Sequence, residues 1–380
     1  MTSLLRFAAA FALLVTAGCG TVTEYKPPAV GKKGEIMVVT DSATWNGPVG
    51  EALRATVGRS LRTFPQPTPA FTLRHESLSE FSLDGLRRQH SVIFAAPYTG
   101  TSETARFIRA RLDSAGVQAL ERGGRGLITR PDLWMRDQLI AYATAPTDSA
   151  LVQQLRAGGD DLRTAFNRLA RTRTTEDMFD KARQTEIEAD LLDRHGFAVG
   201  IQHDYVRAVD TTFVNDQGTR GTFVRYRRFA GQDSWRDFFV YYEEDPRLTR
   251  LAPEAVRALR NDLTQRFIRG TFADSYIAIE DRDPVGRPVE ADTVDLGGRF
   301  AIETRGTWRL TGDIMGGPFV SYAFFDEDTG RFYLIDGMIF GPRYSAAEKR
   351  EFLRQMEAIA YTFRTDGGGV EVLADSGDEG

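Results

Sequence analysis

The stretch Phe319-Val-Ser-Tyr-Ala-Phe-Phe325, Asp326-Glu-Asp-Thr-Gly330, Arg331-Phe-Tyr-Leu-Ile-Asp-Gly-Met-Ile-Phe340 decides the fold of the C-terminal half. Two runs rich in aromatic and aliphatic residues flank a short polar loop, a pattern that predicts two strands joined by a hairpin. Gly330, at the end of the loop, suits a left-handed bulge position. We therefore expect residues 319–325 and 331–340 to be antiparallel neighbours in one sheet.

Further strands and two helices surround this predicted hairpin. A helix beginning at Pro253 has apolar residues at helical spacing, and Ser345-Ala-Ala-Glu348 has the form of a capping box ahead of a closing helix. These patterns predict an α+β domain over residues 196–364, with a mainly antiparallel sheet covered by helices. The other strands are expected at residues 197–201, 222–228, 235–242, 275–280 and 300–304.

The N-terminal half alternates strands with helices. Glu35-Ile-Met-Val-Val-Thr40 is a short apolar run typical of a buried strand, and Trp45-Asn-Gly-Pro48 precedes a helix with Pro48 near its first turn. We expect an α/β domain over residues 34–146. Its further strands are predicted at residues 71–74, 91–96 and 132–144, and its further helices at 78–88 and 103–112.

Residues 147–195 have a helical pattern and predict a helical connector between the two domains. Gly158-Gly159 is expected to break the first helix, because glycine weakens a helix interior. Apart from Ala170, no apolar residue lies between Leu169 and Met178, so we expect that stretch, including Arg171-Thr-Arg-Thr-Thr-Glu-Asp177, to be a solvated connector face. The alternative is that this stretch binds an anionic surface.

The N-terminus has the three regions of a secretory signal: the charge of Arg6, an apolar run over residues 7–18, and small residues at its exit. At about 1.5 Å per residue this run reaches about 18 Å, less than the roughly 30 Å of a membrane core. Thr16-Ala17-Gly18-Cys19 resembles a bacterial lipobox, with Thr16 where Leu is usual. Cys19 is the only cysteine, so it cannot form an intrachain disulfide.

These features predict a signal peptide over residues 1–18 and lipid attachment at Cys19. An incidental cysteine beside an ordinary cleavage site, or in an uncleaved anchor, is the alternative. We expect residues 19–33 to be a lipidated tether and residues 365–380, which are rich in glycine and acids, to be a disordered tail. The predicted location is the cell envelope, at the periplasmic side of the outer membrane.

Length and charge limit the remaining possibilities. A chain of 380 residues is longer than a domain with a single hydrophobic core usually is, and its length is typical of two domains. The formal net charge of −5 argues against a nucleic-acid binder, which needs a basic face. We expect contact with a membrane through the lipid and a partner that is an envelope protein, peptide or polymer. The oligomeric state is left open.

Several motifs together resemble a known family. Trp45-Asn-Gly-Pro48, Leu259-Arg-Asn-Asp262 leading to Gly270 and Ser275-Tyr276, and above all Glu303-Thr-Arg-Gly-Thr-Trp308 with Met315-Gly-Gly-Pro-Phe319 look like an uncharacterised bacterial lipoprotein family catalogued as domain of unknown function 4837. The resemblance extends over nearly the whole mature chain, up to about Arg364. It implies an envelope lipoprotein without assigned activity, and no catalytic residue is carried over.

Motif searches give no catalytic site. The sequence contains no zinc-protease helix motif, phosphate-binding loop or serine-nucleophile elbow, and one cysteine excludes a paired-cysteine site. Its four histidines lack metal-ligand spacing, and His203-Asp204 is interpreted as a hydrogen-bonded turn pair. We predict no catalytic residues, no metal and no cofactor.

One set of residues is a candidate binding patch. Glu303 and Arg305 are two apart on a predicted strand and share the face opposite Phe300 and Ile302. The ordinary explanation is an ion pair on the solvent side. The functional alternative is a recognition cleft for a polar ligand or peptide, formed by Glu303, Arg305, Trp308, Met315, Gly316 and Gly317.

Two hypotheses about function remain. The first is a non-catalytic envelope lipoprotein that serves as a binding or assembly module. The second is an envelope hydrolase that uses a carboxylate pair, for which two acids within about 5–10 Å are needed, or an unrecognised serine nucleophile.

Overall fold

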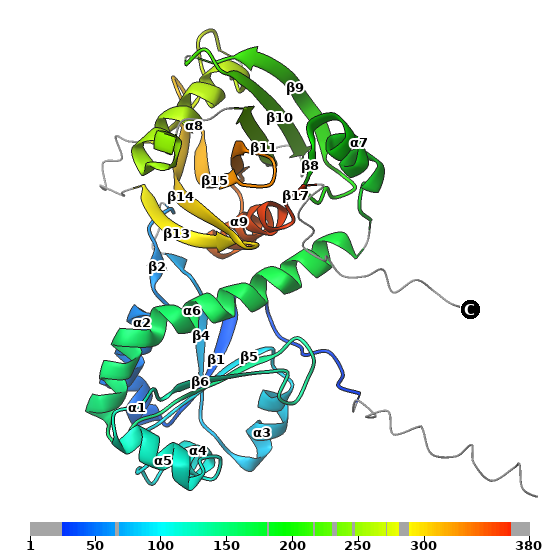
Figure 1. Cartoon of the computed structure of the whole chain (residues 1–380). Helices are drawn as coiled ribbons and strands as arrows, with labels where there is room; N and C mark the ends of the chain where they lie inside the picture. The colour runs from blue at the N-terminus through cyan, green and yellow to red at the C-terminus, as the bar shows by residue number, and fades with distance from the viewer. Residues whose placement is uncertain are drawn as a thin grey trace, which may run out of the picture.

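The computed structural model describes residues 25–64, 68–180, 182–215, 217–229, 234–244, 248–270, 272–280 and 289–365. The predicted signal peptide, Cys19, and residues 366–380 of the predicted tail lie outside the described residues. The fold class expected from the sequence is confirmed: an α/β N-terminal domain, a long helix, and an α+β C-terminal domain (Figure 1).

The N-terminal domain is a five-stranded sheet of order β4-β1-β5-β7-β6, parallel except for β6. Ile36, Val38 and Ile93 face α2 and the long helix α6, while Val39, Val92 and Phe94 face the other layer of helices. Burial on both faces explains the continuous apolar runs in its strands. The strands are β1 (Glu35–Val39), β4 (Thr72–Glu76), β5 (Ser91–Ala95), β6 (Leu127–Pro131) and β7 (Leu139–Ala143), with a small β2–β3 pair (Ser60–Leu61, Thr68–Pro69). The helices are α1 (Ser42–Asn46), α2 (Pro48–Ala55), α3 (Glu80–Arg87), α4 (Glu103–Arg109) and α5 (Ser114–Glu121).

Part of the predicted tether packs on this domain. Pro28 and Val30 form bridges with Arg136 and Gln89, and Ala29 is buried. Residues 28–30 therefore belong to the folded body.

Helix α6 (Asp148–Phe179) is continuous through Gly158-Gly159, so the predicted break there is wrong. A Cβ on Gly159 would lie 2.4 Å from Oγ1 of Thr56, just past the end of α2. The glycine is needed for close approach between two helices, and the helix tolerates its weaker propensity because tertiary packing supports it. Helix α7 (Thr185–His195) follows.

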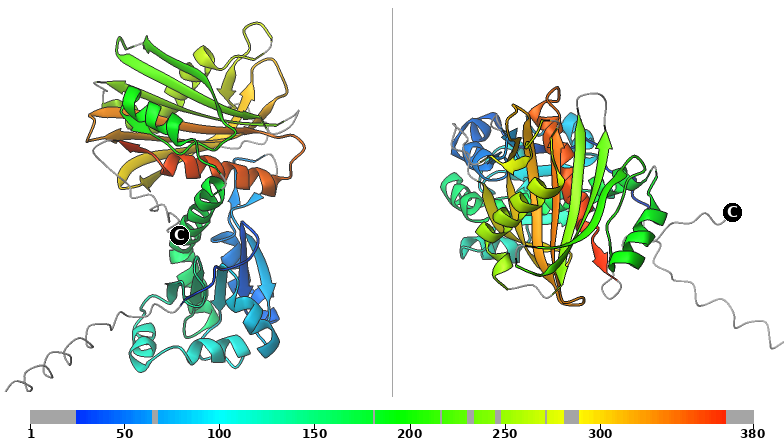
Figure 2. Two further views of the ribbon diagram at one scale, coloured as in Figure 1. Left: turned by 90° about the vertical axis from the view of Figure 1, so that its right-hand side faces the viewer. Right: turned by 90° about the horizontal axis from the view of Figure 1, so that it is seen from above.

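The C-terminal domain is built on a curled eight-stranded sheet of order β12-β14-β15-β16-β11-β10-β9, with β13 paired to β14 (Figures 1 and 2). The predicted hairpin is confirmed: β15 and β16 pair antiparallel, and Gly330 has a φ of 66°. The strands are β9 (Val206–Val214), β10 (Arg220–Phe229), β11 (Trp235–Glu244), β12 (Ile277–Ile279), β13 (Glu290–Leu296), β14 (Arg299–Leu310), β15 (Gly316–Asp326) and β16 (Arg331–Phe340), with a separate β8–β17 pair (Phe197–Ala198, Arg364–Thr365).

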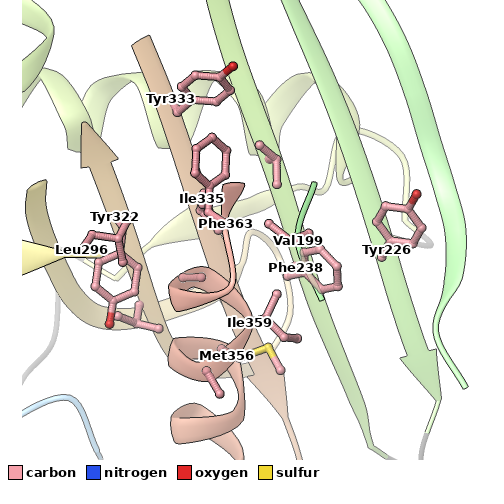
Figure 3. Packing of buried hydrophobic residues seen from close by; sticks show 14 of the residues in the cluster. Val199, Tyr226, Phe238, Leu296, Tyr322, Tyr333, Ile335, Met356, Ile359 and Phe363 are labelled. Carbon is pink, nitrogen blue, oxygen red and sulfur yellow. The ribbon is translucent and has the colours of Figure 1, made fainter. Parts of the chain in front are cut away.

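Helices cover both faces of this sheet. Helix α8 (Pro253–Phe267) packs on one face, where Arg260 forms a buried ion pair with Asp336 of β16. Helix α9 (Ala346–Tyr361), which starts with the predicted capping box at Ser345, packs on the other. Figure 3 shows Met356, Ile359 and the following Phe363 against the sheet residues Ile335 and Tyr333.

Helix α9 also reaches the N-terminal half. It contacts β15 and β16 on one side and α6 on the other, so it lies between the C-terminal sheet and the long helix (Figure 2). Arg171 of α6 stacks on Tyr361, and Thr174 is buried. The polar stretch of α6, expected to be solvated, is therefore partly covered by α9.

Candidate functional site

The predicted patch is anchored by Glu303 and Arg305, which share one face of β14 as expected. Arg305 donates from Nε and Nη2 to the two Glu303 oxygens, at 2.6 and 2.8 Å, and from Nη1 to Glu357 of α9 at 2.8 Å. Burial lowers the pKa of Arg305, but the carboxylates of Glu303 and Glu357 outweigh it and hold that pKa well above its ordinary value. The three side chains are largely enclosed between the sheet and α9, so the pair is not on the solvent side.

Trp308 lies on the opposite face of β14. It is 1% exposed, stacks on Trp235 with ring centroids 5.1 Å apart, and donates from Nε1 to the Ile339 carbonyl at 3.2 Å. Half-buried Met315 packs against the same α8-side cluster. The sheet therefore separates Trp308 from the Glu303–Arg305 pair.

Gly316 and Gly317 allow close packing of the strands. A Cβ on Gly316 would lie 2.7 Å from the Trp308 carbonyl oxygen, and one on Gly317 would lie 2.0 Å from the Ile339 carbonyl oxygen. Neighbouring backbone thus occupies the space that the predicted recognition cleft would need. The six residues of the predicted patch do not line one surface.

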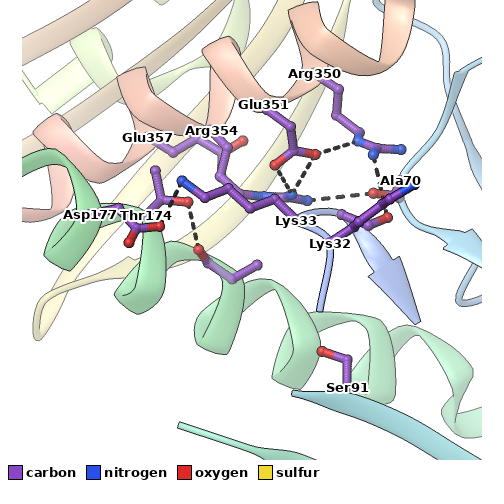
Figure 4. Close-up of polar contacts among 12 residues, drawn as sticks. Lys32, Lys33, Ala70, Ser91, Thr174, Asp177, Arg350, Glu351, Arg354 and Glu357 are labelled. Carbon is purple, nitrogen blue, oxygen red and sulfur yellow. Dashed lines mark hydrogen bonds and ion pairs between the residues drawn. The ribbon is translucent and has the colours of Figure 1, made fainter. Parts of the chain in front are cut away.

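Charged side chains of α9 hold the two domains together (Figure 4). Arg350 donates to the carbonyls of Pro69, at 2.8 Å, and Gly34, at 3.3 Å. Arg354 donates to Glu351 at 2.8 Å and reaches the Ala70 carbonyl at 3.5 Å. Arginines that are buried against backbone carbonyls form directional contacts, so this junction has a defined geometry.

His90 lies beneath this junction, at the start of β5. Its Nε2 is 3.0 Å from the Lys32 carbonyl, and its Nδ1 is 2.8 Å from Oγ of Ser91. Since the carbonyl can only accept, the neutral ring carries its proton on Nε2. Burial, together with the charge of Arg173, lowers the pKa of His90 to about 4.

A cavity of about 500 Å³ opens beside the junction. Its walls come from both halves of the chain: the approach to β1, the end of α6, the turn after β8, strands β10 and β11, and α9. We call it the junction cavity. Its lining residues are Lys33, Asp177, Met178, Gln202, His203, Arg228, Arg236 and Gln355.

Arg236 is the unusual side chain in the junction cavity. It is 7% exposed, and its guanidinium carbon lies 3.8 Å from the ring centre of Phe352. Among the described residues it has no hydrogen-bond or ion-pair partner. Burial and the neighbouring Arg228 lower the pKa of Arg236.

Arg228 stands beside it on β10, in the same orientation toward α9. It forms an ion pair with Asp204 and donates to Oε1 of Gln202 at 3.2 Å. His203 and Asp204 lie in a turn as predicted, and the Asp204 carboxylate pairs with Arg228 on β10 rather than with His203.

The sequence analysis did not identify Arg228 or Arg236 as candidate site residues, although the sequence around Arg236 contains a signal. Arg236 lies two residues before Phe238 on β11 and shares the strand face of Phe238, Val240 and Tyr242, which point into the core. A cation in the apolar phase of a strand marks either a buried ion pair or a site.

A second cavity, of about 260 Å³, lies between β6 and α6. The amide of Gln154 within it is already bonded to the Gly124 carbonyl and the Gly126 amide, at 2.8 and 2.9 Å. The Gln154 amide is therefore already satisfied by the backbone of the loop before β6.

Two findings concern metal binding and membrane spanning in the described part of the chain. No group of three or more histidine, cysteine or acidic residues there is arranged to hold a metal ion. None of its helices combines the length and apolar character needed to cross a membrane.

Comparison with known families divides the chain in two. Residues 184–362 match the model of a domain of unknown function (DUF4837), and residues 29–179 match a second domain of unknown function (DUF8532). The match to the first family is thus shorter than the sequence motifs implied, and Trp45-Asn-Gly-Pro48 falls in the second. No curated protein matches the chain.

Proposed function

We propose that this chain, whose residues 184–362 belong to the domain of unknown function 4837 family, is a lipid-anchored cell-envelope protein that binds a partner without transforming it. The partner is an envelope protein, peptide or polymer that enters the junction cavity. Anchoring is supported by the lipobox-like Thr16-Ala17-Gly18-Cys19, which lies outside the described residues.

The observation that carries the binding role is Arg236, which lines a cavity formed by both domains, is 7% exposed and has no hydrogen-bond or ion-pair partner among the described residues. A buried charge without a partner destabilises the protein that contains it. Such groups concentrate where a protein meets a ligand, because the ligand supplies the missing interactions.

Anchoring is tested by growing cells with labelled fatty acid. The wild-type protein is expected to take up the label and to sediment with membranes, whereas Cys19→Ser should do neither, because no other cysteine is present. Equal labelling of both proteins contradicts the anchoring proposal.

Binding is tested with a photo-crosslinking residue placed at Gln355 in the junction cavity, in cells. Phe81, which is 98% exposed on α3, serves as the control position. We expect a defined adduct from position 355 that is absent from position 81. The same adducts from both positions, or none from position 355, contradict a binding role for the cavity.

A further inference from the structure

The junction cavity has a surplus of positive charge. Lys33, Arg228 and Arg236 line it together with a single carboxylate, Asp177. Counting Asp204 as well, which pairs with Arg228, the described residues at the cavity supply three cations and two carboxylates, a surplus of one positive charge. The chain as a whole has a net charge of −5, so the local sign is opposite to that of the molecule.

Pairing identifies Arg236 as the uncompensated cation. The Lys33 Nζ lies 2.6 Å from a carboxylate oxygen of Asp177, and Arg228 pairs with Asp204. Arg236 lies over the ring of Phe352 and has no hydrogen-bond or ion-pair partner among the described residues. The Phe352 ring attracts the charge of the guanidinium but does not use its N–H groups as conventional hydrogen-bond donors, so an oxygen acceptor can still bind them.

Other polar groups nearby are also incompletely paired. The Tyr205 hydroxyl and Oε1 of Gln355 are buried without a hydrogen-bond partner in the described part of the chain. Burial raises the pKa of Tyr205, and the charges of Arg236 and Arg228 oppose that shift, so the hydroxyl lies within their electrostatic reach. A neutral hydroxyl donor beside two guanidinium groups favours a bound anion.

We infer that the junction cavity binds a singly charged oxyanion, a carboxylate or a phosphodiester, with Arg236 as its main ligand and Arg228 beside it. This inference rests on the proposed binding role of the cavity and names the chemical group that the partner presents. One uncompensated positive charge matches one negative charge, and the planar guanidinium fork matches two oxygens of such a group.

The test measures the melting temperature of the full folded body at pH 7.5 in sodium chloride, sodium acetate and sodium dimethyl phosphate, at equal ionic strength. Wild-type protein is expected to melt roughly 1–3 °C higher in at least one of the two oxyanion salts, since an anion that binds only the folded state stabilises it. The salt that acts tells a carboxylate source from a phosphodiester source.

Arg236→Met separates a binding role from a structural one. If Arg236 serves a ligand, the variant should melt higher than wild type in chloride, because it removes a largely buried charge that has no ion-pair partner among the described residues. The oxyanion increment should disappear. If Arg236 serves only to stack on Phe352, the variant melts lower in every salt, and that outcome overturns the inference.

The matched control is Arg220→Met, an exposed arginine on the same strand as Arg228. It should keep the wild-type melting temperature in chloride and the full oxyanion increment. An increment that survives in Arg236→Met, or that Arg220→Met also loses, overturns the inference. Should Arg236→Met fail to fold, Arg236→Lys keeps the charge without the fork, and its increment should be smaller than that of wild type; an unchanged increment overturns the inference as well.

Crosslinking from position 355 distinguishes the oxyanion inference from the broader proposal that the cavity binds a partner. A defined adduct combined with no oxyanion effect rejects the anion inference and leaves the binding role. The loss of both rejects the binding role itself.

Discussion

His90 illustrates how a single buried side chain links stability to pH. Its pKa of about 4 in the folded protein lies below the ordinary value of about 6.5. Between these two pH values the unfolded chain binds more protons than the folded one. The contribution of His90 to the free energy of unfolding is therefore fully present above about pH 6.5 and is lost as the pH drops toward 4. Arg173 opposes protonation and Glu35 favours it.

We therefore expect the free energy of unfolding of wild type, relative to His90→Gln, to fall by on the order of 2–3 kcal/mol between pH 7 and pH 4. Urea denaturation at several pH values measures this difference, and acid-sensitive groups common to both proteins cancel. A difference that stays constant with pH contradicts the shifted pKa.

Single residues were only partly predictable from sequence. The shared face of Glu303 and Arg305 follows from strand periodicity, but their enclosure depends on Glu357, 52 positions away on α9. Likewise, the strand alternation around Arg236 shows that it faces the core side, whereas its lack of a partner among the described residues depends on which helix covers that side.

At the scale of elements, Gly337 of β16 sets how closely α9 approaches the sheet. A Cβ at this position would lie 2.3 Å from Cβ of Met356, so the helix or the strand has to move. We expect Gly337→Ala to destabilise the protein by about 1–3 kcal/mol, the range typical of overpacking. The midpoint of urea unfolding measures the change.

Gly85→Ala on α3 is the matched control, since nothing lies within 4 Å of the added Cβ. This change should leave stability unaltered or raise it by up to about 1 kcal/mol, because alanine favours helix. Similar losses in both variants contradict the packing role of Gly337.

The sequence predicted elements with strong apolar periodicity and missed polar edge strands. The hairpin of β15 and β16 and the capping box of α9 were both found, because their signals are local. Strands β9 and β13 were missed because they lie at the margins of the sheet and are mostly exposed. Such strands lack the buried alternation by which a strand is recognised.

At the scale of the whole molecule, α9 and α6 join the domains into one unit. Arg350 and Arg354 are both 4% exposed and bond to backbone carbonyls of the N-terminal domain. We expect Arg350→Met combined with Arg354→Met to split one calorimetric unfolding transition into two, the lower shifted down by roughly 10 °C. The cause is the loss of the donors to those carbonyls.

Arg257→Met, which breaks an exposed pair with Glu254 on α8, is the control and should leave a single transition. If the double variant also unfolds in one step at the wild-type temperature, these arginines do not couple the domains.

The arrangement of the domains was not predictable from periodicity. The polar stretch of α6 between Leu169 and Met178 has the pattern of a solvated face, yet Arg173 bonds to the carbonyls of Ala29 and Asp137. Polar residues that are satisfied by another part of the chain look the same in sequence as residues that are satisfied by water.

The position of the junction cavity has a consequence for the evolution of the gene, because the cavity needs both stretches of sequence. Lys33, Asp177 and Met178 fall in the stretch that matches one family, and the other lining residues fall in the stretch that matches the second. A gene that carried either stretch alone would therefore encode only a fragment of the cavity wall.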